Sequence, residues 1–294
     1  MLIPMVPVLG WWLLGLRVFL LGLERPIGKR VVEGYPPHVG ALVFFGLAGI
    51  LHLPPLLFLV AFYPPENLAF LPFSLLNACL SCVAFYFYMR ALRDGEVSLI
   101  TPLYSTSVLF VFFLPILFQR ELFSLWKLIG ALLIFVGATW LKPGTNPFSS
   151  IANLAKERPA RDMVLASAIL SLGRLIDNRW ADLNPYYYAL CASLFNALIF
   201  LIANLLLGTF ASAVGLYRSR RAIAWINGLV NGYAYFILVV VLGLGIELSV
   251  AEPIGSLSML ISVLLGAVMF REKIQARLFA SILMIIGVFA LVRG

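Results

Sequence analysis

The chain consists of long apolar blocks separated by short polar gaps. A helix needs about 20 mostly apolar residues to cross a bilayer, and ten blocks of roughly this kind follow one another along the sequence. They lie within residues 5–34 and at about 39–62, 70–90, 97–118, 125–141, 162–182, 185–209, 222–242, 248–270 and 275–292. The pattern predicts an all-α integral membrane protein with ten transmembrane helices.

The longest polar stretch, residues 142–161, lies between the fifth and the sixth block. We therefore expect a first five-helix repeat at residues 1–141, a polar linker at 142–161 and a second five-helix repeat at 162–294.

The two halves resemble each other when the chain is shifted by about 150 residues, and the matches fall on rare residue types. At an offset of 149, Arg25, Ile27, Arg30, Glu33 and Pro36 correspond to Arg174, Ile176, Arg179, Asp182 and Pro185. At an offset of 150, Asn77, Ser81 and Phe85 correspond to Asn227, Asn231 and Tyr235. At an offset of 151, Glu96, Ser98, Pro102, Ser105, Ser107, Leu109, Arg120 and Glu121 correspond to Glu247, Ser249, Pro253, Ser256, Ser258, Leu260, Arg271 and Glu272.

Because each repeat has an odd number of spans, the second half enters the membrane from the opposite side. Inverted repeats of this kind are common in secondary transporters, whose substrate site lies near the midplane where the repeats meet. The repeat therefore predicts a carrier.

Composition narrows the class of protein. Of the 294 residues, 62% are hydrophobic and only 12% are charged, about half the charged fraction of a soluble domain, which argues against a soluble or disordered chain. The net charge is +8, and the basic residues fall in the gaps between apolar blocks, as residues that set membrane topology do. Nucleic-acid binding is therefore not expected. Cys79, Cys82 and Cys191 do not form a disulfide scaffold, and we interpret Cys79-x-x-Cys82 as small buried packing residues.

The basic residues also predict an orientation. Fourteen Lys and Arg residues fall in one set of alternate gaps and four in the other. The positive-inside rule places the first set in the cytoplasm, which puts both termini outside.

Several motifs resemble the ten-helix EamA-like branch of the drug/metabolite transporter (DMT) superfamily. The fourth and ninth spans contain Pro102 and Pro253, and each is followed by an acidic residue, Glu121 or Glu272. The fifth and tenth spans contain glycine, and Ala91-Leu92 ends the third span, although Leu242-Gly243 stands at the corresponding place in the second half. The resemblance implies two five-helix repeats and transport of a metabolite, with termini usually described as inside.

Charged side chains within the hydrocarbon are expensive and indicate function. If Arg25 and Arg174 are related by the repeat, both converge on a central cavity, where guanidinium groups suit a carboxylate or phosphate. The alternatives are local ion pairs, of Arg174 with Asp177 and of Arg25 with Glu24 or a residue of another helix, or snorkelling to the interface. Arg17 has no symmetric counterpart and ranks lower.

Further candidates are polar residues inside the apolar blocks. Asn77, Asn227 and Asn231 either line the cavity or bond to neighbouring helices, and Tyr235 either forms part of the cavity wall or belongs to an interfacial belt. Ser105 and Ser256 follow the two span prolines, and Glu252 is a candidate coupling group because its counterpart, Thr101, is neutral. We expect Glu121 and Glu272, at loop starts, to cap the N-terminus of the next helix.

Together these features predict a multi-pass secondary transporter of the bacterial inner membrane. Its partners are a small polar substrate, anionic or zwitterionic, the lipid bilayer and, as a candidate, a coupling proton; monomer and homodimer are both open. The alternative is a flippase or exporter of a lipid-linked or hydrophobic compound. Catalysis, a metal and a cofactor are not expected, since His38 and His52 are the only histidines and no nucleophile constellation occurs.

Overall fold

The structure, a computed structural model, describes residues 8–104, 106–110, 125–141, 147–180 and 184–293. These residues form helices and contain no strand, which confirms the all-helical class. The first half contains α1 (Val8–Val32), α2 (Pro37–Phe62), α3 (Leu71–Asp94), α4 (Val97–Tyr104) and α6 (Leu125–Leu141). The second half contains α8 (Arg158–Trp180), α9 (Pro185–Leu206), α11 (Arg221–Gly243), α12 (Leu248–Ser256), α13 (Ser258–Phe270) and α14 (Gln275–Arg293). Two short helices, α7 (Pro147–Lys156) and α10 (Phe210–Ser219), connect longer ones.

Five segments of the described chain are long and apolar enough to cross a membrane: α2, α3, α9, α11 and residues 250–270 of α12 and α13. Shorter apolar helical segments lie at residues 97–110, 128–138 and 275–290. The outer surface matches a lipid environment, because large apolar side chains such as Trp12, Leu206 and Val268 are 75–82% exposed. A water-exposed surface rarely carries so much contiguous apolar area.

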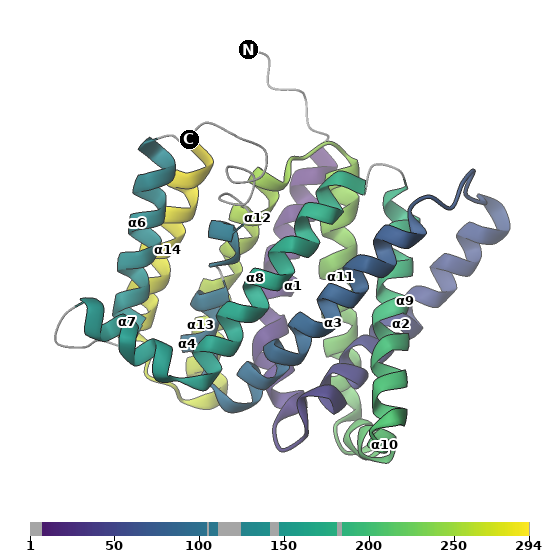
Figure 1. The fold of residues 1–294 in the computed structure, drawn as a ribbon, viewed down its shortest axis with the longest axis horizontal. Helices are drawn as coiled ribbons and strands as arrows, with labels where there is room; N and C mark the ends of the chain where they lie inside the picture. The colour runs from purple at the N-terminus through teal and green to yellow at the C-terminus, as the bar shows by residue number, and fades with distance from the viewer. Residues whose placement is uncertain (1–7, 105, 111–124, 142–146, 181–183, 294) are drawn as a thin grey trace, which may run out of the picture.

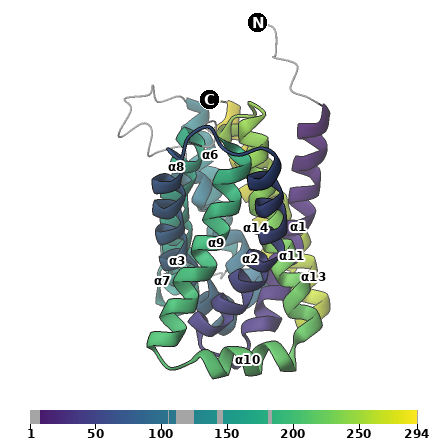
Figure 2. The same cartoon turned by 90° about the vertical axis from the view of Figure 1, so that its right-hand side faces the viewer.

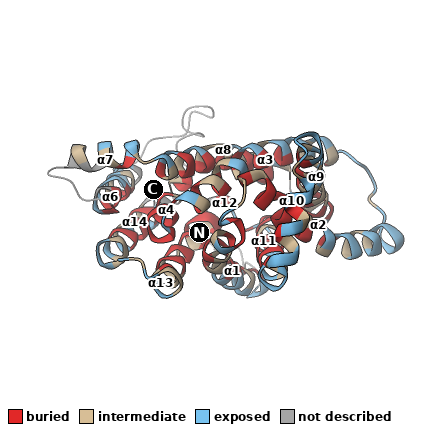
Figure 3. Cartoon of the chain, turned by 90° about the horizontal axis from the view of Figure 1, so that it is seen from below, coloured by how far each residue is buried: buried red, intermediate tan, exposed pale blue. Residues whose placement is uncertain are grey.

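Most of the long helices form two rows that face each other, with many of the buried residues on the facing sides (Figure 3). In one row, α4 packs against α8, α8 against α3 and α3 against α9. In the other, α13 packs against α1, α1 against α11 and α11 against α2. Each row therefore mixes helices from both halves of the chain. The pair formed by α6 and α14 lies at one side of the rows (Figure 1).

The first long helix of each half begins at a different end of the bundle. In Figure 1, α1 begins at the end of the bundle where both termini lie, whereas α8 begins at the opposite end, next to α7. A side view of the bundle shows α10 lying across that same opposite end (Figure 2).

Glycine allows α6 and α14 to approach closely. A Cβ atom on Gly287 would lie 2.7 Å from the carbonyl oxygen of Gly130, and one on Gly137 would overlap Met284. Small residues favour helix association in lipid because they let backbones come together.

The segment that contains Pro253 is divided into α12 and α13 at Leu257. Proline lacks an amide hydrogen and disturbs the helical hydrogen-bond ladder. Close to the proline, a carbonyl of α12 contacts a side chain: Ala251 O accepts a hydrogen bond from Arg17 Nη1 at 3.2 Å. The disturbed helix thus provides a polar backbone group to the interior of the bundle.

The two cysteines of the Cys79-x-x-Cys82 pair have different surroundings. Cys82 is buried and its thiol donates to Asn196 Oδ1 at 3.2 Å, whereas Cys79 is exposed. The prediction that both cysteines are buried packing residues is therefore wrong for Cys79. Residues i and i+3 share one broad face of a helix, and Cys79 lies at the edge of this face, which reaches the outer surface.

Glu272 joins the halves at the end of the bundle opposite to the termini. Its carboxylate accepts hydrogen bonds from the backbone N–H groups of Val97 and Ser98, at 2.9 and 2.8 Å, and lies 3.7 Å from Lys29 Nζ. We call this set of contacts the Glu272 cap. The expectation that Glu272 caps the next helix, α14, is wrong. Arg271 ends α13 in the left-handed conformation (φ 55°), and the carboxylate reaches the N-terminus of α4 in the other half. Glu121 lies outside the described residues.

Candidate functional site

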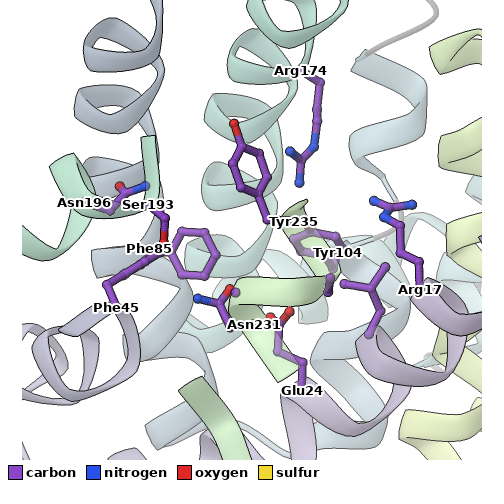
Figure 4. A pocket seen from close by; sticks show the side chains of 13 residues that line it. Arg17, Glu24, Phe45, Phe85, Tyr104, Arg174, Ser193, Asn196, Asn231 and Tyr235 are labelled. Atoms are coloured by element: carbon purple, nitrogen blue, oxygen red, sulfur yellow. The ribbon is translucent and has the colours of Figure 1, made fainter. Parts of the chain in front are cut away.

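A small polar cavity lies between the two rows of helices, at the centre of the bundle (Figure 4). Its volume of about 40 Å³ has room for a few water molecules, each of which needs about 10–15 Å³. It is lined by Arg17, Leu21, Glu24, Phe45, Phe85, Tyr104, Arg174, Ser193, Asn196, Asn231, Gly232, Ala234 and Tyr235. Both halves of the chain therefore contribute to its wall.

A chain of ion pairs runs beside the cavity and joins three helices. Arg17 Nη2 of α1 donates to Glu252 Oε1 of α12 at 2.9 Å. The same oxygen lies 3.5 Å from Arg174 Nε of α8, and Arg174 Nη1 donates to Asp177 Oδ2 at 3.0 Å. Two guanidinium groups are thus neutralised by two carboxylates.

Asp177 is fully buried and is held by several donors. Its Oδ1 accepts hydrogen bonds from Asn77 Nδ2 at 2.7 Å and from Tyr235 OH at 3.0 Å. The Tyr235 hydroxyl also accepts from Asn77 at 2.9 Å. Because a buried carboxylate is costly unless hydrogen-bonded and paired, this network fixes Asp177 and through it Arg174.

Glu24 and Arg25 are neighbours on α1 but have different partners, since consecutive helical residues do not face each other. Glu24 accepts a hydrogen bond from Tyr88 OH at 2.8 Å and has no Lys, Arg or His nitrogen within 4 Å among the described residues. Arg25 donates to Ser258 Oγ at 3.3 Å, and its guanidinium carbon lies 4.5 Å from the centre of the Tyr104 ring. Glu24 is therefore a cavity-wall carboxylate without an ion-pair partner in the described chain.

The structure places three of the predicted site residues in the cavity wall: Arg174, Asn231 and Tyr235. Three others, Arg25, Ser256 and Glu252, line a smaller neighbouring cavity that shares Arg17 and Tyr104 with the first.

The remaining predicted residues lie elsewhere. Asn77 is behind the wall, where it holds Asp177. Asn227 is buried outside both cavities, and its amide has no hydrogen-bond partner among the described residues. Ser256, which lines the smaller cavity, donates its hydroxyl to the carbonyl of Pro253 at 2.6 Å within its own helix. Ser105 lies outside the described residues.

Sequence reasoning ranked Arg17 low and did not select Glu24, although both line the cavity. A helical signal was present, because residues 17, 21, 24 and 25 fall on one face of α1. No pattern in the sequence marks Phe45, Phe85 and Asn196 as residues of the wall, because residues of these types recur in the apolar blocks. Their position depends on how separate helices pack.

A helical bundle with an apolar exterior and a charged central cavity has the features of a membrane transport protein. Residues 8–141 match the EamA-like transporter family. The first half of the chain is therefore similar to the EamA-like transporters of the drug/metabolite transporter superfamily, the resemblance that its motifs predicted.

A comparison with solved structures supports the fold over the whole chain. A crystal structure described only as "Crystal structure of protein" is similar with a TM-score of 0.62 and 15% sequence identity, over 95% of this chain and 94% of that chain. Identity at this level speaks for the fold alone. No curated protein matches the chain.

Proposed function

We propose that the protein is a secondary transporter that moves a small polar metabolite, anionic or zwitterionic, by alternating access. The observation that carries this proposal is the central cavity, whose charged wall is built from both halves of the chain. Charged groups at such a depth are expensive and are usually kept for a substrate or ion.

The order of helices in the two rows supports an organisation as two inverted five-helix repeats. If α1 corresponds to α8, α2 to α9, α3 to α11 and, by the offset of 151, α4 to α12, the contacts of α4 with α8, α8 with α3 and α3 with α9 have counterparts in those of α12 with α1, α1 with α11 and α11 with α2. In this proposal the two halves rock against each other around the cavity. The Glu272 cap then closes one of its two ends.

The proposal gives the predicted residues distinct roles. Arg174, Asn231 and Tyr235 contact the substrate, and Asn77 positions Asp177. The role of Glu252 as a coupling group for a proton stays a prediction. Its carboxylate lies 2.9 Å from Arg17 and 3.5 Å from Arg174.

A two-stage experiment tests the proposal. Purified protein is first heated with amino acids, organic acids, sugar phosphates and lipid phosphates, and a compound that binds the native state should raise the melting temperature. The compound with the largest effect is then loaded into proteoliposomes, where we expect it to drive counterflow of its radiolabelled form. Stabilisation and exchange confined to lipid phosphates would contradict transport of a small metabolite and favour the flippase.

The basic end of the bundle is proposed to face the cytoplasm of a bacterium, with the protein in the inner membrane. Residues such as Arg30, Arg93, Arg158 and Arg220 lie at or near that end, opposite to the termini (Figure 1). A reporter fused after Gly294 should therefore be active only outside the cytoplasm. Cytoplasmic activity of the fusion would contradict this orientation.

A further inference from the structure

The formal charges of six ionisable side chains at the centre of the bundle sum to zero. Among the described residues, three arginines and two carboxylates line the two cavities, namely Arg17, Arg25, Arg174, Glu24 and Glu252. A third carboxylate, Asp177, lies behind the wall and pairs with Arg174. All six are at least mostly buried, the most exposed being Arg174 with a side chain that is 15% exposed.

A balanced cluster restricts what can enter it. An ion with a net charge would leave one unit of charge uncompensated in a low-dielectric interior, at a high cost in free energy. A molecule that carries one positive and one negative group adds no net charge. The balance of the cluster therefore favours a zwitterion over an anion.

Glu24 and Arg174 lie on opposite sides of the cavity. In the close-up, Tyr104 lies between the two side chains and Tyr235 stands beside Arg174 (Figure 4). The carboxylate of Glu24 receives only the hydroxyl of Tyr88 from the described residues, so it retains acceptor capacity for an ammonium group.

The opposite side offers donors for an anionic group. Arg174 uses Nη1 for Asp177 and Nε for Glu252, while its Nη2 donates to no described residue. A guanidinium has five N–H donors in a planar fork, so the unused ones can bind a carboxylate while the ion pairs persist. Phe85 lines the cavity, and its ring lies 5.0 Å from that of Tyr88, the residue that donates to Glu24. An aromatic ring in this position favours a cation near its face.

We propose that the transported metabolite is a zwitterion whose cationic group binds Glu24 and whose anionic group binds Arg174. This inference rests on the proposed transport function and sharpens its substrate class. It also assigns Glu24, rather than Glu252, as the carboxylate that meets the substrate.

The substrate class is tested with three sets of compounds that share carbon skeletons: L-α-amino acids, the corresponding carboxylates without the amino group, and the corresponding amines without the carboxyl group. We expect only amino acids to raise the melting temperature of the purified protein and to show counterflow in proteoliposomes. Stabilisation by the carboxylates alone or the amines alone would overturn the zwitterion and leave transport standing. No stabilisation by any set, with no counterflow, would overturn both.

The role of Glu24 is tested on the amino acid with the largest effect. Glu24→Gln should weaken its binding about 10-fold to 100-fold, as expected for loss of a hydrogen bond to a charged group. The same variant should bind the matched carboxylate more tightly than the wild type does, because the cluster then carries one excess positive charge. That gain also shows that the variant is folded.

Two further variants complete the test. Glu33→Gln makes the same change at the exposed end of the same helix and should leave binding unchanged. Glu24→Asp keeps the charge and should retain the preference for the amino acid over the carboxylate. Wild-type affinity of Glu24→Gln for the amino acid, or reversal of the preference in Glu24→Asp, would overturn the assignment.

Discussion

Replacing Arg174 by alanine is expected to abolish transport and to lower the free energy of unfolding by about 3–5 kcal/mol. The substitution removes the cation shared by Asp177 and Glu252, at 3.0 and 3.5 Å. Asp177 is fully buried, so its carboxylate would keep only the hydrogen bonds from Asn77 and Tyr235. Denaturant titration of the purified protein and counterflow in proteoliposomes measure the two effects.

Arg179→Ala provides the matched control, because Arg179 lies on the same helix and is exposed. It should change the free energy of unfolding by less than about 0.5 kcal/mol, as surface substitutions usually do. Arg174→Lys keeps the positive charge but lacks the planar array of N–H donors. It should therefore restore more of the free energy of unfolding than of the transport rate. Wild-type transport by a folded Arg174→Ala protein would contradict the role of this residue in the site.

The second large effect is expected for Glu252→Gln. The change leaves Arg17, which is 3% exposed, without a carboxylate, and breaking a buried pair in this way costs about 3–5 kcal/mol. Replacing both partners, with Arg17→Leu and Glu252→Gln, removes the unpaired charge, so the double variant should be more stable than the sum of the single changes predicts. Thermal or denaturant unfolding of the four proteins gives this coupling energy, which is expected to be about 0.5–3 kcal/mol.

Glu66→Gln, at an exposed loop position, is the control for the change of side chain. The same proteins also separate two roles of Glu252. If its main role is to couple proton movement, Glu252→Gln should keep its stability and its substrate exchange and lose only the accumulation driven by a pH gradient. That outcome would contradict the view that Glu252 mainly links Arg17 to Arg174.

The helical class could be predicted because apolar blocks of about 20 residues have few alternatives in a bilayer. The interruption at Leu257 between α12 and α13 could only be suspected from Pro253. The predicted ion pair of Arg174 with Asp177 is present, since it depends on helical spacing alone. In contrast, the contacts of Glu252 with Arg17 and Arg174 join three helices and depend on their packing.

The symmetry of the sequence was informative for some site residues and misleading for others. It selected Arg174, which lines the cavity, together with Arg25, which lines the smaller one. It also lowered the rank of Arg17, whose counterpart is absent from the second half, although Arg17 contacts both cavities. A binding site at a pseudo-symmetric interface needs asymmetric side chains to hold an asymmetric substrate, so the exceptions to the repeat are informative as well.

In the proposed alternating access, the Glu272 cap contributes to the free-energy difference between the closed and the open form. Its hydrogen bonds to Val97 and Ser98 lie at the end of the bundle, where water can replace the carboxylate when the halves separate. Each such bond contributes about 1.5–3 kcal/mol net because water competes for both partners. Hydrogen bonds of this strength make the open form less stable than the closed form but leave it populated. A ligand that binds the two forms with different affinity can shift the equilibrium between them.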